Sequence, residues 1–339
     1  MGYRGIKAAV GPAMEMLYQP WIRGEENIPD SGAAILASNH LAVIDSFFLP
    51  LLIDREVAFI GKSDYFTGKG IKIGVIDGPV DTSVPELQGA NVTVKQMCSY
   101  TASDAGRSHA TAVASILAAR GYGVARGAEI INYSIPSSDD SYGSECKDTH
   151  IEDGINAAVA DGVRVLSISL GGGDLAERSR EAIGGAIARG VVVVVGTGND
   201  GAQDPADSLA SVNGTVGVGA SDSSGNFQSF SNYGKGLTVL APGDKTVMHL
   251  FPTGKLVNAW GTSYATPIVA GFVAVAMQRW PGATGNQVVQ SLVKTATTGR
   301  SGYPLISPNG LDKTDPTQFP DENPLLDKFP GTEPSAQTV

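Results

Sequence analysis

Cysteine, histidine and positive charge are all scarce in this chain of 339 residues. It has two cysteines and four histidines, and 34 acidic against 24 basic side chains give a formal net charge of −10. An acidic surface repels phosphate groups, so this charge argues against a partner that is a nucleic acid or an anionic membrane. Two cysteines are too few for a disulfide framework, and neither Cys98 nor Cys146 belongs to a CxxC or CxxxH pattern. We therefore expect two free thiols rather than one bridge, although the sequence does not encode their distance.

Long hydrophobic runs are missing as well. The most apolar stretch, residues 33–53, contains Asn39, His40 and Asp45, which hydrocarbon penalises, so we expect no transmembrane segment. The first residues have no charged stub followed by an apolar core and a cleavage site, so we expect no signal peptide. The compartment stays unassigned, with the cytoplasm as the default, and the oligomeric state stays open.

The residues that are present divide the chain into three regions. Residues 1–70 are rich in aromatic and long aliphatic side chains, whereas residues 71–300 are rich in Gly, Ala, Ser and Val. Residues 301–339 contain many Pro and Asp and have no clear periodicity. We interpret these regions as an N-terminal segment, a main domain and a C-terminal tail.

Short apolar runs alternate with Ala-rich segments in the main domain. The apolar runs predict strands at 71–77, 128–135, 163–170, 191–196 and 216–220. The Ala-rich segments predict helices at 108–121, 151–162 and 176–190, each ending in Gly. Continuous apolar runs are typical of strands buried on both faces. The pattern predicts an α/β fold, a doubly wound and mostly parallel sheet with helices on both faces.

Four polar residues follow strands or begin helices in this pattern. Asp77 ends the first predicted strand, Asn199 follows the "VVVVVG" run, and His109 and Ser263 stand at predicted helix starts. Taken singly, an Asp at a strand end is usually a turn residue, and a Ser before a helix is usually an N-cap. Functional groups of parallel sheets nevertheless gather beyond the carboxyl ends of the strands, where all four are expected.

The motifs around these residues resemble those of the subtilisin-like serine proteases, or subtilases, over about residues 72–300. "GTSYATPIVAG" at 261–271 is similar to the family's nucleophile motif GTSxAxPxVAG. "VIDGPVD" resembles its aspartate motif and "SHATAVASI" its histidine motif. "SLGGG" and "GTGND" resemble its substrate and oxyanion segments, and the order Asp, His, Ser also agrees.

The resemblance implies a role for each residue. Ser263 would be the nucleophile and His109 its base, while Asp77 would hold the imidazole in the required tautomer. The side-chain amide of Asn199 and the backbone N–H of Ser263 would bind the oxyanion. Such a site acts on a polypeptide in an extended conformation.

The resemblance also assigns a substrate-binding segment, which would pair with the peptide as an added strand. Its residues are Ser169, Leu170, Gly171 and Gly172. No cofactor or catalytic metal is implied. Structural calcium is common in the family, but no Asp-rich loop here is distinctive enough to assign a calcium site.

Four positions depart from the family pattern. Gly78 and Pro79 follow the aspartate where the family usually has Ser or Thr and then Gly. Ala110 follows the histidine where the family usually has Gly, and Ala112 replaces the second histidine of the HGTH pattern. A pseudoprotease that binds peptides without cleaving them is therefore an alternative.

The N-terminal segment carries a different resemblance. His40 and Asp45 have the H-x4-D spacing of glycerophosphate acyltransferases, and the flanks "NIPDSGAAILASNH" and "FIGKSDYFTGKG" resemble those of lysophosphatidate acyltransferases. In that family the His deprotonates the acceptor hydroxyl and the Asp orients the His. The family's phosphate-binding motif of FPEGTR type is absent, so the resemblance covers a truncated, partial α/β fragment over about 3–70. We expect a serine endopeptidase with an inactive fragment, and lipid acyl transfer is the second alternative.

Overall fold

The structure is a computed structural model that describes residues 68–328, apart from 138–139, 143–145, 147–149 and 171–174. By contacts the chain divides into two units, Met1–Tyr65 and Phe66–Val339, and all described residues belong to the second. His40 and Asp45, and likewise Gly171 and Gly172, lie outside the described residues.

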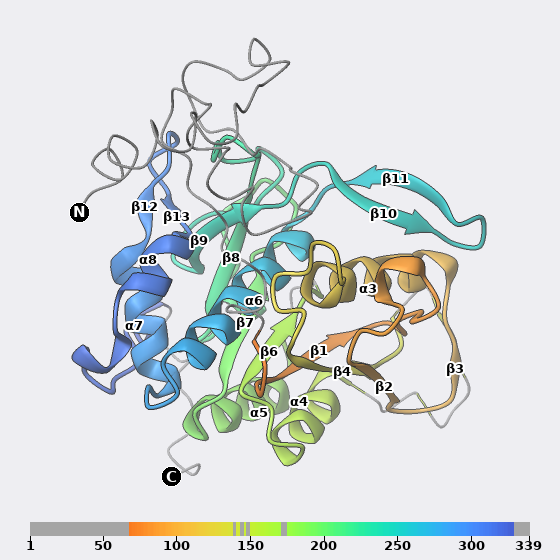
Figure 1. The fold of residues 1–339 in the computed structure, drawn as a ribbon, viewed down its shortest axis with the longest axis horizontal. Coiled ribbons are helices and arrows are strands. Elements are labelled where there is room, and N and C mark those ends of the chain that lie inside the picture. The colour runs from red at the N-terminus through yellow and green to blue at the C-terminus, as the bar shows by residue number, and fades with distance from the viewer. Residues whose placement is uncertain (1–67, 138–139, 143–145, 147–149, 171–174, 329–339) are drawn as a thin grey trace, which may run out of the picture. The chain divides into compact units, whose positions relative to one another are not determined.

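The centre of the fold is a nine-stranded sheet (Figure 1). Its order is β12-β13-β9-β8-β7-β6-β1-β4-β2, and every neighbouring pair is parallel except β12 with β13. The strands are β1 (Lys72–Asp77), β2 (Val92–Gln96), β4 (Glu129–Ser134), β6 (Val165–Ile168), β7 (Val192–Gly196), β8 (Val216–Ser221), β9 (Leu237–Pro242), β12 (Thr297–Thr298) and β13 (Pro304–Leu305). The predicted doubly wound sheet is confirmed.

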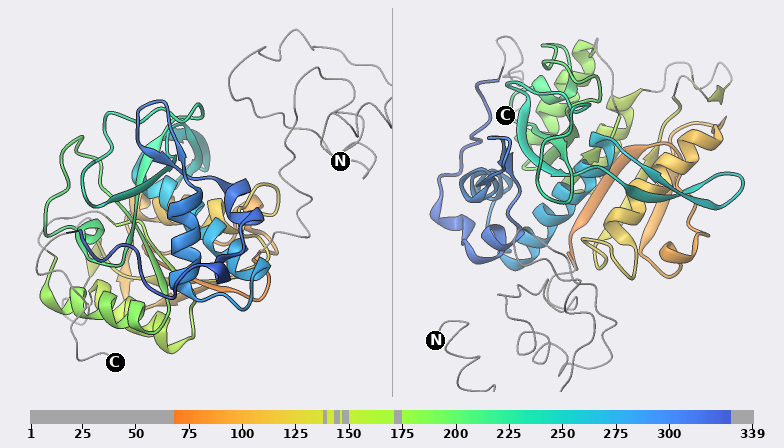
Figure 2. Two further views of the ribbon diagram at one scale, coloured as in Figure 1. Left: turned by 90° about the vertical axis from the view of Figure 1, so that its left-hand side faces the viewer. Right: turned by 90° about the horizontal axis from the view of Figure 1, so that it is seen from above.

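Helices cover both faces of this sheet (Figure 2). One face packs against α3 (Asp104–Ala118), α6 (Thr262–Arg279) and α7 (Gly285–Thr295). The other face packs against α4 (Ile151–Ala160) and α5 (Glu177–Ala188). The central strands β1, β6 and β7 are almost fully buried, because continuous Val and Ile runs present apolar side chains to both layers.

Small side chains let α6 lie close to its neighbours. A Cβ on Gly271 would stand 2.8 Å from Val124 Cγ1 and 2.9 Å from Val124 Cβ, so only glycine fits at this point. Ala265, Ala270 and Ala274 are fully buried on the same helix. This close packing fixes the start of α6 beside the carboxyl ends of the central strands.

Smaller elements connect and extend the sheet. A two-stranded hairpin, β10 (Thr246–Leu250) with β11 (Lys255–Ala259), projects from the main body and leads into α6 (Figure 1). β3 (Tyr100–Thr101) pairs with β5 (Ser141–Tyr142). The remaining elements are η2 (Pro85–Leu87), η4 (Leu209–Ser211), α8 (Pro308–Lys313) and η5 (Pro316–Gln318).

The prediction of two free thiols is wrong. Cys98 and Cys146 form a disulfide, with their Cα atoms 5.5 Å apart. The bridge joins the loop after β2 to the connection between β5 and α4, two segments that are 48 residues apart in the chain. Their approach depends on the order of β1, β4 and β2 in the sheet, which local sequence patterns do not reveal.

Candidate active site

The candidate residues gather at the carboxyl ends of the central strands. Asp77 is the last residue of β1, Ser169 follows β6, and Asn199 lies three residues after β7. His109 comes from α3 and Ser263 from the first turn of α6. The chain passes from β4 on one side of β1 to β6 on the other, so this edge is the switch point at which parallel sheets place their ligand sites.

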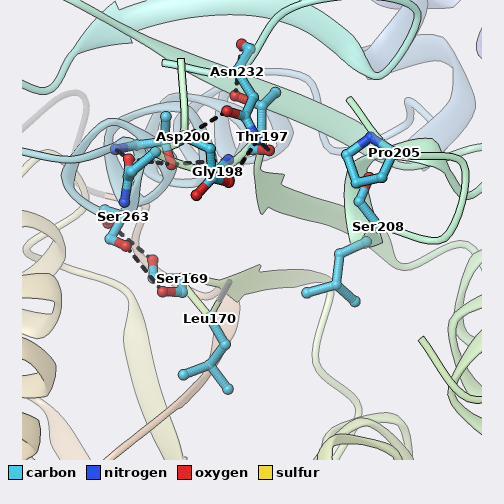
Figure 3. Close-up of a pocket in the computed structure, with 13 residues that line it drawn as sticks. Ser169, Leu170, Thr197, Gly198, Asp200, Pro205, Ser208, Asn232 and Ser263 are labelled. Carbon is cyan, nitrogen blue, oxygen red and sulfur yellow. Dashed lines mark hydrogen bonds between the residues drawn. The ribbon is translucent and has the colours of Figure 1, made fainter. Parts of the chain in front are cut away.

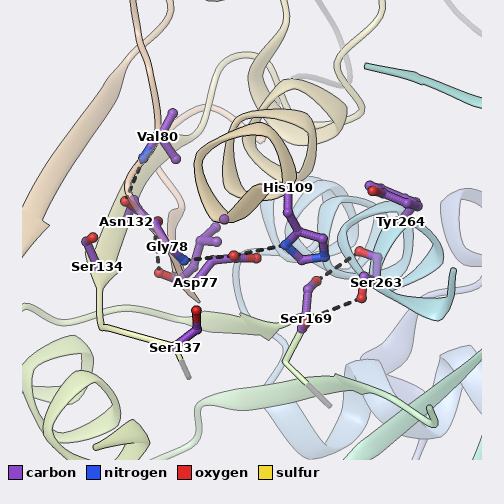
Figure 4. A network of polar contacts seen from close by, with 12 residues as sticks. Asp77, Gly78, Val80, His109, Asn132, Ser134, Ser137, Ser169, Ser263 and Tyr264 are labelled. Carbon is purple, nitrogen blue, oxygen red and sulfur yellow. Dashed lines mark hydrogen bonds and ion pairs between the residues drawn. The ribbon is translucent and has the colours of Figure 1, made fainter. Parts of the chain in front are cut away.

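Asp77 and His109 form the best-defined pair of the site (Figure 4). The distance from His109 Nδ1 to Asp77 Oδ1 is 3.0 Å, and the backbone N–H of Gly78 donates to the same oxygen at 2.8 Å. The carboxyl group is 2% exposed and the imidazole 27%. Burial by itself lowers the pKa of His109, but the charge of Asp77 and its hydrogen bond outweigh this effect, so the pKa lies above the ordinary value.

Ser263 lies on the other side of the imidazole in the view of Figure 4. Its hydroxyl donates to the backbone carbonyl of Ser169 at 3.0 Å, and the Ser169 hydroxyl donates to the carbonyl of Ser263 at 2.9 Å. The ring of Tyr264, the next residue, has its centroid 5.7 Å from that of His109. The structure thus brings Asp77 and His109 into hydrogen-bond contact and places Ser263 nearby, with its hydroxyl bonded to Ser169.

The helix boundaries differ from those predicted around both residues. The N-cap of α6 is Gly261, and Ser263 is the second helical residue, so its hydroxyl does not cap the helix. α3 begins at Asp104, with the Ser103 side chain accepting from the N–H of Gly106, so His109 stands in the second turn rather than at the start. The interpretation of Ser263 as the N-cap of this helix is therefore wrong.

Asn199 takes part in the cap of α6. Its Oδ1 accepts hydrogen bonds from the backbone N–H of Thr262 at 2.8 Å and from the Thr262 hydroxyl at 3.1 Å. These bonds orient the side chain, and among the described residues its amide nitrogen has no acceptor. Since Ser263 lies in the first turn of α6, its backbone N–H has no acceptor within the helix either. The side-chain amide of Asn199 and the backbone N–H of Ser263 are thus two donors at the start of α6 that have no acceptor among the described residues.

Two buried asparagines that sequence reasoning does not identify hold the loops of the site. Asn132 on β4 donates to the carbonyl of Gly78 at 3.2 Å and accepts from the N–H of Val80 at 3.4 Å. Asn232 accepts from the N–H of Asp200 at 2.9 Å and donates to the carbonyl of Thr197 at 3.2 Å. An Asn inside the apolar run "AEIINYSI" is the available signal for the first.

A cavity of about 330 Å³ opens beside Ser263 (Figure 3). Ser169 and Leu170 lie on one side of it, and Pro205 and Ser208 lie on the other. The other lining residues are those from Gly196 to Asp200, Leu209, Asn232, Thr262 and Ser263 itself. A cavity of this size next to a serine hydroxyl can hold one side chain of a bound peptide.

The chain is similar to known proteins in sequence and in fold. A family model described as "Subtilase family" (Peptidase_S8) matches residues 68–316. The chain belongs to the subtilase family. It is a serine-type endopeptidase of that family. A second model, described as "Acyltransferase", matches residues 20–80, most of which lie outside the described residues.

Individual relatives agree with the subtilase assignment. Subtilisin NAT of Bacillus subtilis subsp. natto is 32% identical over 286 residues, which cover 81% of this chain and 73% of the relative. The self-cleaved protease domain of PatA has a TM-score of 0.61 and 28% identity, covering 73% of this chain and 97% of that one. The PatG macrocyclase in complex with peptide has a TM-score of 0.62 and 20% identity, covering 74% and 93%, and shows the likeness of fold.

Two departures of this subtilase from the family pattern face each other in the structure. A Cβ on Gly78 would stand 3.1 Å from the carbonyl oxygen of Gly106 and 3.7 Å from the methyl group of Ala110. The methyl group of Ala110 therefore lies next to the space that a side chain at position 78 would fill. With glycine at 78 the chain lacks the hydroxyl group that the family usually has after the aspartate. Asp77 Oδ2 is buried without a hydrogen-bond partner in the described part of the chain.

Membrane-spanning and metal-binding features are both lacking in the described residues of this subtilase. None of their helices combines the length and apolar character that crossing a membrane requires. The same residues contain no group of three or more His, Cys, Asp or Glu side chains that could hold a metal ion.

Proposed function

We propose that Asp77, His109 and Ser263 act as a catalytic triad that hydrolyses peptide bonds through an acyl-enzyme. The observation that carries the proposal is the 3.0 Å bond from His109 Nδ1 to buried Asp77. An imidazole that donates its Nδ1 proton to a carboxylate keeps Nε2 free to accept a proton when it is neutral. That nitrogen is the one that a serine nucleophile needs.

The first step is attack of Ser263 Oγ on the scissile carbonyl carbon. The hydroxyl turns from the Ser169 carbonyl to His109 Nε2, which takes its proton as the new C–O bond forms. The oxyanion accepts from the Asn199 amide and the Ser263 backbone N–H. When the C–N bond breaks, the imidazolium of His109 gives the proton to the leaving amine.

The second step returns the enzyme to its starting state. Water attacks the ester carbonyl while His109 takes a proton from the water and then passes it to Ser263 Oγ. The acid product leaves with the new C–O bond. Only side chains, backbone groups and water take part, so the reaction as proposed needs no cofactor.

The substrate we propose is a polypeptide in an extended conformation. The backbone after β6, at Ser169 and Leu170, would pair with it, and one substrate side chain would enter the 330 Å³ cavity. Turning of the Ser263 hydroxyl towards His109 releases the Ser169 carbonyl to accept an N–H of that substrate. Gly171 and Gly172 would continue the same binding edge.

A fluorophosphonate probe tests the triad because it labels only an activated serine. Full-length protein should take one label, Ser263→Ala should take none, and the exposed-turn control Ser224→Ala should label as the parent does. Peptidase kcat in Ser263→Ala should fall by about 10⁶-fold. Absence of label on the folded parent would mean that the chain is a peptide-binding pseudoprotease, and equal labelling of parent and Ser263→Ala would mean that the activated residue is not Ser263.

The N-terminal segment is proposed to be inactive in acyl transfer. The support is the missing phosphate-binding motif downstream of His40 and Asp45. Purified protein should not transfer an acyl group from acyl-CoA to lysophosphatidate. Acylation that is lost in His40→Ala and retained in Ser263→Ala would show that the segment is an enzyme in its own right.

A further inference from the structure

The last described residues, 319–328, form a C-terminal strap that runs from α7 to the loop after η4. The Gln287 side chain donates to the carbonyl of Phe319 at 3.0 Å, which holds the start of the strap against α7. Further along, the N–H of Gly214 donates to the carbonyl of Leu325 at 2.8 Å. The family model ends at residue 316, so the strap lies beyond the part of the chain that this model matches.

Lys328 ends the strap in an environment that is unusual for a lysine. It is 3% exposed, although lysine is almost never fully buried without partners. Its Nζ donates to the carbonyls of Ala210 at 2.9 Å and Gly236 at 3.0 Å, and to the hydroxyl of Thr215 at 3.4 Å. Its backbone N–H donates to Oδ1 of the buried Asn213 at 2.9 Å. These four bonds fasten the end of the strap inside the molecule.

The lysine lies behind one wall of the 330 Å³ cavity. We call residues 204–210 the wall segment, because three of its members line the cavity, namely Pro205, Ser208 and Leu209 (Figure 3). Ala210, whose carbonyl accepts from Lys328, directly follows Leu209 in η4. One peptide unit therefore separates the lysine's acceptor from a residue that lines the cavity.

The other end of the wall segment meets the same lysine. A Cβ on Gly236 would stand 2.7 Å from Asp204 Oδ2 and 3.1 Å from the carbonyl oxygen of Ala210, so both ends of the segment pack against this glycine. The carbonyl of Gly236 is the second acceptor of Lys328. Burial lowers the pKa of Lys328 to about 7, and the charge of Asp204 opposes this effect. The lysine thus contacts one end of the wall segment and attracts the other.

We propose that Lys328 positions the wall segment and thereby determines how tightly the site binds a large side chain on the acyl side of the scissile bond. This inference rests on the triad and the substrate cavity proposed above. Lys328 lines neither the cavity nor the catalytic groups, so it is a positioning residue that acts through η4.

The physical reason lies in the two carbonyl acceptors. Without the N–H groups of Lys328 the buried carbonyl of Ala210 loses a partner, and a buried unpaired acceptor costs free energy. η4 is a single short turn of three residues, so it can shift more easily than the strands beside it. Leu209 would move with it and change the shape of the cavity. A small substrate residue would not sense this change, whereas a large one would.

The experiment compares two peptide substrates that differ only in the residue before the scissile bond, which is phenylalanine in one and glycine in the other. The ratio of their kcat/KM values does not depend on the amount of active enzyme, because one preparation cleaves both. We expect the full-length parent to prefer phenylalanine by about 100-fold at pH 8. Lys328→Met should lower this ratio about tenfold, through a higher KM for the phenylalanine substrate and a kcat within about twofold of the parent. Lys328→Gln keeps a shorter N–H donor and should lie between them.

Controls separate this role from a general loss of stability. Leu311→Ala removes a buried side chain of α8, so it should lower the free energy of unfolding and leave the ratio unchanged. Lys313→Met replaces an exposed lysine of the same helix and should change neither quantity. A fluorophosphonate with small alkyl groups leaves the cavity empty, so it should label the parent and Lys328→Met at equal rates.

Three results in the Lys328 variants would overturn the inference. They are a phenylalanine-to-glycine ratio equal to that of the parent, equal losses for both substrates, and a fall in kcat at unchanged KM. If Lys328→Met gives no folded protein, Lys328→Gln decides alone. A folded parent that neither cleaves nor takes the label refutes the triad and the inference with it, whereas cleavage with an unaltered ratio in the variants refutes the role of Lys328 alone.

Discussion

Replacement of Lys328 by methionine should remove a rise in folding stability between pH 7 and 9.5. Lys328 is 3% exposed, and its ammonium group donates to the carbonyls of Ala210 at 2.9 Å and Gly236 at 3.0 Å. Burial lowers the pKa of Lys328 to about 7, although the nearby charge of Asp204 opposes this. Lys328 lies behind η4, whose residue Leu209 lines the 330 Å³ cavity.

The magnitude follows from the difference between the folded and unfolded chain. Lysine in the unfolded chain titrates near its ordinary pKa of 10.5, whereas in the folded chain it releases its proton near 7. Between these values the unfolded state binds one more proton, so stability increases with pH by about 1.4 kcal/mol per unit. From pH 7 to 9.5 the gain is about 3 kcal/mol. The raised pKa of His109 acts in the opposite direction near neutrality, but it is common to parent and variant.

The assay is urea unfolding in a Ser263→Ala background, which prevents self-cleavage. The free energy of unfolding is measured at pH 7, 8, 9 and 9.5 with and without Lys328→Met. Loss of the lysine also removes a positive charge that keeps the pKa of Asp204 from rising further. The free energy of unfolding of the variant should therefore stay constant or fall as the pH rises. Lys313→Met, at an exposed position on α8, is the matched control and should follow the parent. Parallel profiles for parent and Lys328→Met would refute the reasoning.

Three further changes test the site and its support. Asp77→Asn should lower kcat about 10⁴-fold. It should also move the acidic limb of the kcat/KM profile to lower pH, because His109 loses the neighbouring charge that raises its pKa. An acidic limb at the parent's pH would contradict this. Joint replacement of Cys98 and Cys146 by serine removes a disulfide between residues 48 positions apart, and it should lower the free energy of unfolding in urea by about 4 kcal/mol. A loss below about 1 kcal/mol would count against a disulfide in solution. Gly271→Ala places a methyl group against the side chain of Val124 and should lower the free energy of unfolding by about 1–3 kcal/mol, whereas an unchanged value would mean that α6 can move aside.

Much of the fold follows from local patterns. The runs of Val and Ile at β1, β4, β6, β7 and β8 are long enough and apolar enough to predict buried parallel strands. The strand β2 was not predicted. It lies at the edge of the sheet, where most of its residues are exposed, and its sequence therefore has no continuous apolar run. β9 was not predicted, although its sequence LTVLAP is mostly apolar. The hairpin strands β10 and β11, TVMHL and KLVNA, are short and mix polar with apolar residues, so their patterns do not mark them as buried strands.

By itself, the sequence determined which residues are candidates for the chemistry and where the central strands lie. The motifs and their order predicted that Asp77, His109 and Ser263 form one site. The predicted ends of the strands indicated that this site lies at one edge of a sheet. These features are local or depend on chain order, so they can be read without knowing the packing. The family assignment rests on them as well.

Only the tertiary structure decided the contacts between distant segments. It paired Cys98 with Cys146, set Asn132 behind the loop after Asp77, and buried Lys328 behind η4. It also bonded Ser263 to Ser169, 94 residues away, rather than to its own helix end. The physical reason is common to all four. Each contact joins segments whose distance is set by strand order and helix packing, and the local spacing of residues carries no record of that distance.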